Sequence, residues 1–291
     1  MSATIACIAG EEIHRQWEGG RIEGERLGRR STPFGDSGEV FRVHAEEASY
    51  YLLPRHGQHL AKTAPARVPD RANLYALKDL GVERVLAWGP GGAITHNIAV
   101  GDLVILDDLI DRTYLRERTF FELSPLGYLR QFPVFCPHLR RVLAAALEEM
   151  KLLHHPTGTA AVSEGPRLET PAEVRMLGTI GAEVVTHNFV PEVFLAKELQ
   201  LCYAAVCYVV NFAETGSRHR PFAPGSLFGP PSEKTDGERL AGVVGALSQI
   251  VGSVAGAVGH DPRPCECGQT MAAHVRQYDL PADWRQWFET P

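Results

Sequence analysis

Polar residues that could bind or cleave a small molecule recur at the ends of predicted strands. Glu11 and Glu12 follow a short apolar run at residues 4–9, and Arg55 and His56 follow a hairpin predicted over residues 39–53. In open α/β sheets, ligands bind beyond the carboxyl ends of the strands. We therefore expect one polar site for a small ligand, with further candidates at the ends of later strands. These are Gly89, Glu169, His187, Asn188 and Asn211.

The elements that would position these residues alternate between strands and helices. Apolar runs predict strands near residues 102–111, 158–165 and 202–212, and residues 83–94 predict a strand, a glycine turn and a further element. Apolar spacing predicts helices at 71–81, 137–151 and 236–258. Several strands are apolar on both faces, which is typical of a sheet covered by helices. The predicted fold is α/β, with a central mixed sheet flanked by helices.

Composition excludes several classes of protein. The 291 residues are 44% apolar and 22% charged, with a formal charge of −6. Such values are ordinary for a globular chain and give no basic footprint for nucleic acid or an anionic membrane. No apolar stretch reaches the ~20 residues of a spanning helix. The N-terminal run is predicted as a strand rather than a secretory signal, and we expect a cytoplasmic protein.

The six cysteines do not predict a disulfide scaffold. Cys7, Cys136, Cys202 and Cys207 lie in apolar surroundings and are expected to be reduced core thiols. Cys265 and Cys267 form a C-x-C in a Pro/Gly-rich tail, without a CxxC or HxxxH pair beside them. The spacing therefore does not predict a metal site, although it leaves open whether these two cysteines form a disulfide.

Several segments, in one order, resemble the methylthioadenosine phosphorylase branch of the purine nucleoside phosphorylases. They are TPFG (32–35), LLPRHG (52–57), RANLYALKDLG (71–81), GDLVILDDLIDRT (101–113), FCP (135–137), EGPRLETPAE (164–173) and VPEVFLAKE (190–198). The resemblance implies a nucleoside phosphorylase-like domain over residues 1–258 followed by a tail over 259–291. It also implies a homotrimer or hexamer with a distorted sheet, no cofactor, and cleavage of the N-glycosidic bond of a purine nucleoside.

The base-binding residues implied by this resemblance favour a 6-oxopurine. Adenosine-type members carry an aspartate where this chain has Asn211 in VVNF. An amide can donate to O6 and N7 of the base, whereas an ionised carboxylate can only accept. Glu169 would accept the N1–H of hypoxanthine or guanine, and Leu168 would lie beside the base. GPRLET with VVN is similar to bacterial methylthioinosine phosphorylases. Alternatively, Asn211 only ends a strand and Glu169 only begins a helix.

The phosphate site departs from the family pattern. Arg55 and His56 are retained, but Glu11 replaces a threonine in the first glycine turn, Gly89 lies in the middle turn, and His187-Asn188 replaces a Met-Thr pair. A carboxylate about 4 Å from a phosphate would repel it by at least ~1 kcal/mol per charge. We therefore expect Arg55 to pair with Glu11, and Glu11 or Glu12 to activate water in a hydrolytic reaction.

Other interpretations remain open from the sequence. Glu11 can simply cap a helix, where its charge suits the dipole. Phosphorolysis, with inorganic phosphate as co-substrate, gives the ribose 1-phosphate, and a catalytically silent nucleoside-binding protein is a third possibility. His187, Asn188 and His56 are expected at the ribose. Residues 213–232 are a candidate lid or subunit-contact loop.

Overall fold

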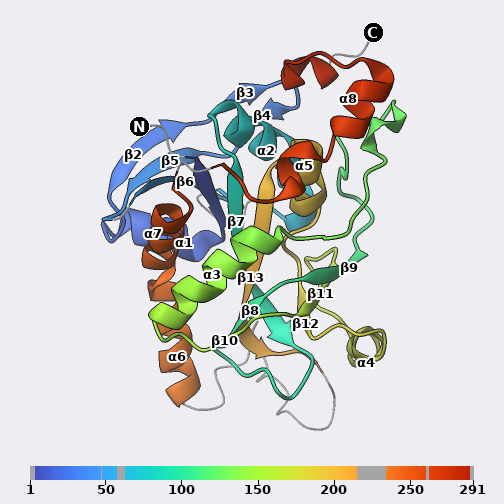
Figure 1. The fold of residues 1–291 in the computed structure, drawn as a ribbon. Helices are drawn as coiled ribbons and strands as arrows, with labels where there is room; N and C mark the ends of the chain where they lie inside the picture. The colour runs from blue at the N-terminus through green and yellow to red at the C-terminus, as the bar shows by residue number, and fades with distance from the viewer. Residues whose placement is uncertain (1–3, 47, 58–62, 215–233, 260–261, 289–291) are drawn as a thin grey trace.

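Four apolar parallel strands form the centre of one mixed sheet in the computed structural model, which describes residues 4–46, 48–57, 63–214, 234–259 and 262–288 (Figure 1). β1 pairs with β6 on one side and with β7 on the other, and β7 pairs with β13. Burial on both faces is typical of parallel strands covered by helices. The four strands are β1 (Ile5–Ala9), β6 (Ser49–Pro54), β7 (Arg84–Ala93) and β13 (Cys202–Phe212).

Shorter strands extend and distort this sheet. Its main path runs β10-β8-β13-β7-β1-β6-β5-β2, and β5 and β6 form the predicted antiparallel hairpin. The end of β7 also pairs with β12, which leads through β11 to β9. The sheet is therefore mixed and distorted, as predicted. The remaining strands are β2 (Gly24–Gly28), β5 (Val40–His44), β8 (Leu103–Ile105), β9 (Asp108–Arg112), β10 (His154–His155), β11 (Thr159–Ser163) and β12 (Val184–Thr186), with a separate pair β3 (Ser31–Thr32) and β4 (Gly35–Asp36).

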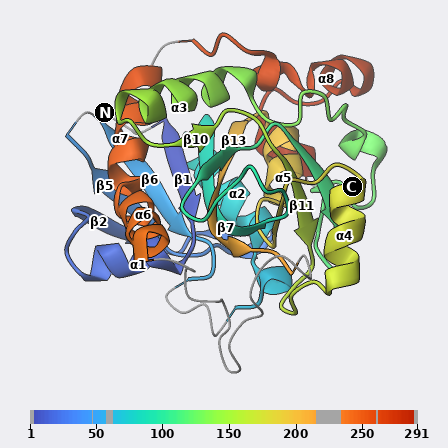
Figure 2. The same cartoon turned by 90° about the horizontal axis from the view of Figure 1, so that it is seen from below.

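Helices cover both faces of the sheet (Figures 1 and 2). Apolar side chains of α1, α3 and α7 pack on one face, and those of α2 and α5 pack on the other. α4 covers a small cluster beside β11 and β12. The helices are α1 (Glu11–Glu18), α2 (Asp70–Asp79), α3 (Pro137–Glu149), α4 (Pro171–Thr179), α5 (Glu192–Glu198), α6 (Lys234–Gly245), α7 (Leu247–Val258) and α8 (Ala272–Tyr278), with 3₁₀ turns η2 (Pro65–Arg67), η3 (Pro125–Gly127), η4 (Glu266–Gln269) and η5 (Trp284–Phe288).

The glycines of residues 89–92 do not form the predicted turn. They lie inside β7, which continues to Ala93. A Cβ on Gly91 would lie 2.4 Å from Cys207 Sγ and 2.9 Å from the carbonyl oxygen of Val185. Glycine is therefore needed here because β13 and β12 crowd the end of β7, which is a known use of glycine within a strand.

Two other predicted elements are each divided in the structure. The strand expected over residues 102–111 is two strands, because β8 pairs with β13 whereas β9 pairs with β11. The helix expected over residues 236–258 is α6 and α7, which bend by 43° at Ala246. Gly242 and Gly245 precede the bend, and glycine is a common cause of helix kinks. No single described helix has the length and apolar character to cross a membrane, and only the bent pair of α6 and α7 has both when joined.

The C-terminal tail packs on the domain through aromatic side chains. Trp284 contacts Tyr75 of α2 with 4.9 Å between ring centroids, and Phe288 lies 5.0 Å from Phe120. In Figure 1 this red segment lies beside α2, β3 and β4. The division of the chain at residue 258 stays a prediction, but these contacts tie the tail to the same apolar cluster as α2 and α5.

Glu198, at the end of α5, makes stability depend on pH. Its carboxylate accepts from Thr119 Oγ1 and the Phe120 N–H, each at 2.7 Å, but burial raises its pKa to about 7. The folded chain therefore binds a proton that the unfolded chain has lost above its ordinary pKa near 4.5. We expect the free energy of unfolding to fall by about 3 kcal/mol as pH rises from about 4.5 to beyond 7.

Glu198→Gln removes this titration while keeping an oxygen acceptor. In urea unfolding at a series of pH values, the variant should lack the decline and exceed the wild type in stability at pH 8. Glu122→Gln, which changes an exposed carboxylate, should retain the decline. If the free energy of unfolding declines with pH equally in Glu198→Gln and in the wild type, Glu198 is not the group that causes the decline.

Candidate active site

A cavity of about 530 Å³ lies at the carboxyl ends of the central strands. Its volume is within the range of small-molecule sites in proteins, roughly 300–1,000 Å³. Gly10 enters its wall after β1, and Pro90, Gly91 and Gly92 enter it from β7. Seven of the residues predicted for the site line the cavity together. They are Glu12, His56, Leu168, Glu169, His187, Asn188 and Asn211.

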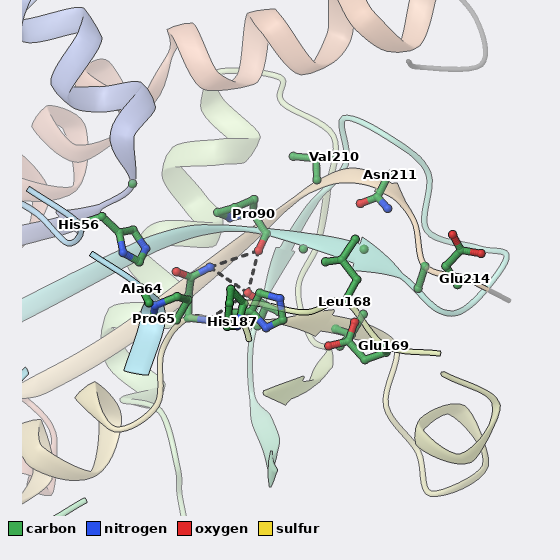
Figure 3. Close-up of a pocket in the computed structure, with 18 of the residues that line it drawn as sticks. His56, Ala64, Pro65, Pro90, Leu168, Glu169, His187, Val210, Asn211 and Glu214 are labelled. Carbon is green, nitrogen blue, oxygen red and sulfur yellow. Dashed lines mark hydrogen bonds between the residues drawn. The ribbon is translucent and has the colours of Figure 1, made fainter. Parts of the chain in front are cut away.

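The cavity has two chemically different ends, which lie on opposite sides of the view in Figure 3. Asn211, Leu168 and Glu169 lie at one end, and His56 lies at the other beside Pro65. His187 lies between them. A ligand that spans the cavity would therefore meet an amide and a carboxylate at one end and an imidazole at the other.

A chain of hydrogen bonds links Glu169 to His187 through Ser163. Ser163 Oγ donates to Glu169 Oε1 and lies 2.8 Å from His187 Nδ1. Because the hydroxyl proton is used on the carboxylate, His187 Nδ1 must carry the proton that it shares with Ser163 Oγ. The Ser163 carbonyl, 3.3 Å away, is a second acceptor for that proton. His187 Nε2 is then an acceptor for a ligand hydroxyl.

The start of α4 fixes the loop that carries Glu169. Thr170 is the N-cap, its hydroxyl accepts from the Glu173 N–H, and the Glu173 carboxylate accepts from the Thr170 N–H. Pro171 occupies the first helical position, where its fixed φ and missing N–H suit the helix. The sequence ETPAE thus places the Glu169 side chain directly before a rigid helix start.

Asn211 lies near the end of β13, where the pairing with β7 shifts register between Val209 and Asn211. Its Nδ2 donates to the Phe212 carbonyl at 2.9 Å. The side chain still lines the cavity, opposite Gly92 in the strand register. The amide is therefore held at the cavity wall by its own strand, and among the described residues its oxygen and its second N–H have no hydrogen-bond partner.

Arg55 lies behind the cavity wall and is already neutralised. Its Nε and Nη2 donate to the Glu192 carboxylate, the latter at 3.2 Å, and both side chains are buried. Nη1 donates to the Trp88 carbonyl at 3.1 Å and to Asn188 Oδ1 at 3.3 Å. The described acid on Arg55 is therefore Glu192. The predicted pairing with Glu11 stays a prediction, because the Glu11 side chain is outside the described part of the structure. Glu192 lies in the VPEV motif, for which the sequence alone predicts no role.

His56 is neutral at the opposite end of the cavity. Burial, assisted by the charge of Arg55, lowers its pKa to about 4. Its Nδ1 lies 3.2 Å from the Thr63 carbonyl, an oxygen that can only accept, so Nδ1 carries the proton. His56 Nε2 can therefore accept a proton or a hydrogen bond, but the side chain does not supply a positive charge near pH 7.

Gly89, which the sequence places at the phosphate site, does not line the cavity. A Cβ at this position would lie 2.9 Å from the Asn188 side-chain amide. Gly89 therefore makes room for Asn188, whose Nδ2 donates to Thr186 Oγ1 at 3.0 Å. Through these contacts Asn188 connects the cavity wall to the buried guanidinium of Arg55.

The Glu12 carboxylate lies over the start of α1. A Cβ on Gly10, the N-cap residue, would lie 2.7 Å from Glu12 Oε2. The same carboxylate faces Tyr208, whose pKa is raised well above its usual value by burial and then by the charge of Glu12. An acidic oxygen therefore occupies the neighbourhood of the backbone N–H groups that begin the helix.

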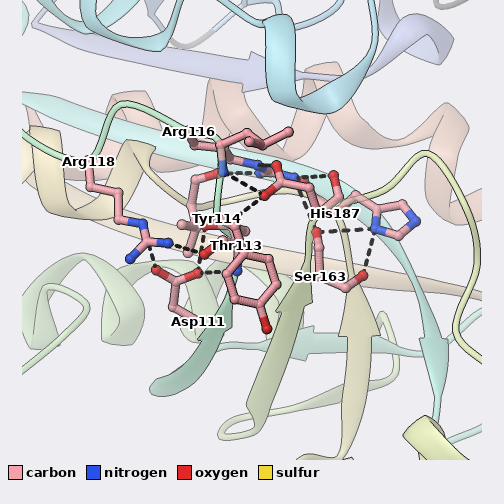
Figure 4. Close-up of polar contacts among 10 residues, drawn as sticks. Asp111, Thr113, Tyr114, Arg116, Arg118, Ser163 and His187 are labelled. Atoms are coloured by element: carbon pink, nitrogen blue, oxygen red, sulfur yellow. Dashed lines mark hydrogen bonds and ion pairs between the residues drawn. The ribbon is translucent and has the colours of Figure 1, made fainter.

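Arg116 is a site-supporting residue that the sequence analysis missed (Figure 4). Its buried guanidinium donates to the carbonyl of His187 at 2.8 Å and to the carbonyls of Ser163 and Glu164 at 3.1 and 3.0 Å. Its Nε also donates to the Glu164 carboxylate at 3.2 Å. Arg116 thus holds together the ends of β11 and β12. No local signal in residues 113–119 marks it, because its partners are distant in the sequence.

Comparisons with known proteins agree with this fold. The family model described as Phosphorylase superfamily matches residues 19–258. A probable 6-oxopurine nucleoside phosphorylase from Thermococcus kodakarensis is 40% identical over 190 residues, which are 62% of this chain and 70% of the relative. An S-methyl-5'-thioadenosine phosphorylase from Pyrococcus furiosus is 37% identical over 211 residues, covering 72% and 79%. The structure of methylthioadenosine phosphorylase from Schistosoma mansoni with adenine is 25% identical, with a TM-score of 0.79 and coverage of 96% of this chain and 100% of that one.

Proposed function

Because the chain is an enzyme of the purine nucleoside and methylthioadenosine phosphorylase family, we propose that it cleaves the N-glycosidic bond of a 6-oxopurine nucleoside with phosphate as the acceptor. The observation that carries the base preference is the placement of Glu169 and Asn211 at one end of the cavity. The names of several relatives, among them two 6-oxopurine nucleoside phosphorylases, support phosphate as the acceptor. Inosine, guanosine and methylthioinosine are the candidate substrates.

At the base end, the two side chains would stabilise the leaving group. Glu169 accepts the N1–H of the keto purine, and the Asn211 amide donates to O6 or N7. As the C–N bond lengthens, negative charge develops on the purine. A donor that is already in position when the charge develops stabilises the transition state more than the ground state. The bond breaks toward an oxocarbenium-like ribose, which a weak nucleophile can capture.

The sugar and the acceptor would occupy the rest of the cavity. His187 Nε2 accepts from a ribose hydroxyl, since its Nδ1 proton is already used on Ser163. At the far end, His56 Nε2 accepts the proton of hydrogen phosphate, and the first N–H groups of α1 lie beside Gly10 in the wall. Backbone N–H groups at a helix start favour an anion, which supports this location for phosphate.

Hydrolysis is a second candidate, which one specific observation favours. The described lining residues include the acids Glu12, Glu169 and Glu214 but no lysine or arginine. The Glu12 carboxylate lies beside Gly10, close to where phosphate would bind, and would repel it. A carboxylate in this location could instead take a proton from an attacking water. The predicted role of Glu11 in such a reaction stays a prediction.

The phosphate dependence of product formation distinguishes the two reactions. With inosine, guanosine or methylthioinosine, we expect purine release to require phosphate and to yield the ribose 1-phosphate. Glu12→Gln should then lower the KM for phosphate about tenfold, because it removes a repulsion of roughly 1–2 kcal/mol.

Glu18→Gln, at the exposed far end of the same helix, is the matched control and should leave the KM for phosphate unchanged. Purine release at the same rate without phosphate, together with a loss of at least about 100-fold in kcat for Glu12→Gln, would establish hydrolysis instead. Nucleoside binding in calorimetry with no turnover under either condition would favour the silent binding protein.

Exposed apolar side chains support the trimer or hexamer that the family resemblance implies. Leu123, Tyr128 and Phe132 are each more than four-fifths exposed, and Tyr114 and Leu115 are about two-thirds to three-quarters exposed. Large apolar patches on a protein surface commonly mark protein contacts. The loop predicted over residues 213–232, with its aromatic and basic side chains, falls almost entirely outside the described residues.

A further inference from the structure

Four cysteine sulfurs gather at one point outside the cavity. Cys136 precedes α3, Cys202 begins β13, and Cys265 and Cys267 lie at the start of η4 in the tail. All four Sγ atoms lie within 4.8 Å of one another, and those of Cys202 and Cys265 are 3.4 Å apart. The partners of the C-x-C pair, which the sequence did not reveal, thus come from two distant parts of the domain.

The arrangement suits one tetrahedral metal ion. Zinc–thiolate bonds of about 2.3 Å place the sulfurs of a tetrahedral site about 3.8 Å apart. We propose that Cys136, Cys202, Cys265 and Cys267 bind one Zn²⁺ ion as four thiolates. Thiolate ligands select zinc over calcium or magnesium. Four protein ligands leave no position for water, so the site would be structural rather than catalytic.

The surroundings of the cluster suit coordinated thiolates. The Leu139 N–H donates to Cys136 Sγ at 3.4 Å, and Cys136 is the N-cap of the 13-residue helix α3. A helix N-terminus stabilises negative charge, and N–H donors to metal ligands orient them. The Thr270 hydroxyl lies 2.7 Å from the Lys197 carbonyl and 3.3 Å from the Cys267 carbonyl. These bonds hold the C-x-C segment against the end of α5.

Zinc at this point would join the tail to the domain. The cluster links the start of α3, the start of β13 and residues 265–267, which are far apart in the sequence. Because the four ligands are brought together only in the folded chain, binding would contribute directly to folding stability. Each thiol loses its proton on binding, so affinity should weaken as the pH falls.

Metal analysis of the full-length chain tests the site. After expression in zinc-supplemented medium and purification without chelator, we expect about one zinc per chain by elemental mass spectrometry. The double variant Cys265→Ser, Cys267→Ser should lose the zinc, and its melting temperature should fall by about 5 °C or more. Cys7→Ser changes a buried thiol of β1 outside the cluster and should retain the full zinc content.

A second measurement keeps the test decisive if the double variant does not fold. Wild-type chain that has been stripped of metal under reducing conditions and loaded with Co²⁺ should show the charge-transfer and d–d bands of a tetrahedral tetrathiolate site. Absence of zinc in the wild type, with no uptake on titration, would overturn the proposal. Detection of disulfides among the four cysteines in the freshly purified chain, by mass spectrometry of alkylated peptides, would overturn it as well.

Discussion

Replacing Arg55 by methionine is expected to lower the free energy of unfolding by about 3–5 kcal/mol. The change leaves the Glu192 carboxylate buried with Tyr203 Oη as its remaining described donor, at 2.8 Å. A charge without a counter-charge in the interior is strongly destabilising, whereas an intact buried pair contributes little net stability. Arg55 also donates to Asn188, so the variant should lose activity as well. Urea unfolding and steady-state kinetics would measure the two effects.

The matching double variant separates the charge from the packing. Adding Glu192→Gln to Arg55→Met removes the uncompensated carboxylate and should recover more than half of the lost stability. Arg26→Met breaks an ion pair with Glu39 in which the arginine side chain is 57% exposed, and it should cost less than about 1 kcal/mol. Equal losses in Arg55→Met and in the double variant would show that the pairing of charges is not what stabilises this region.

Replacing Asn211 by aspartate is expected to shift the base preference by about 100-fold toward 6-amino purines. The aspartate loses the N–H donor for a keto oxygen and gains an acceptor for an exocyclic amino group. A buried polar group without a partner costs roughly 1–3 kcal/mol, which accounts for the size of the shift. The measurement is the ratio of kcat/KM for inosine and adenosine, and for the two corresponding 5'-methylthio nucleosides.

Asn97→Asp provides the control for this shift, because it makes the same chemical change at an exposed position. Its ratio of kcat/KM values should equal that of the wild type. A wild-type ratio in Asn211→Asp, with activity retained, would refute the proposed role of Asn211 in base recognition. Loss of all activity together with a normal unfolding curve would place the residue in leaving-group stabilisation instead.

The sequence predicted the strands and helices well where apolar runs and spacing were clear, as in β1, α3 and β13. It failed at β7, because a run of glycines is locally indistinguishable from a turn. The pairing of this segment with β13 and β12 explains why it is extended, and the crowding of Gly91 against Cys207 and Val185 explains why glycine is needed there. The sequence also predicted one strand over residues 102–111, where the structure has two. Its two halves, β8 and β9, pair with different strands of the sheet, and the apolar run alone does not show this division.

Seven of the predicted site residues came together because they lie at or beyond the ends of strands, which is a local property. Their partners are not local. Glu192, which neutralises Arg55, and Arg116, which joins the ends of β11 and β12, are 137 and 47 residues from the groups they contact. The same holds for the four cysteines, because spacing along the chain shows only the C-x-C pair. Long-range contacts of this kind need the tertiary structure.

If Glu169 binds the purine and His187 the ribose, as proposed, the bridge through Ser163 couples the recognition of the two halves of the nucleoside. A base N–H that donates to Glu169 makes the carboxylate a weaker acceptor for the Ser163 hydroxyl. The hydroxyl is then less polarised and accepts less strongly from His187 Nδ1–H, so the imidazole ring is held less firmly. Free base and sugar fragments should therefore bind with negative cooperativity rather than additively. Inhibitors that mimic only one half of the nucleoside would forgo this coupling.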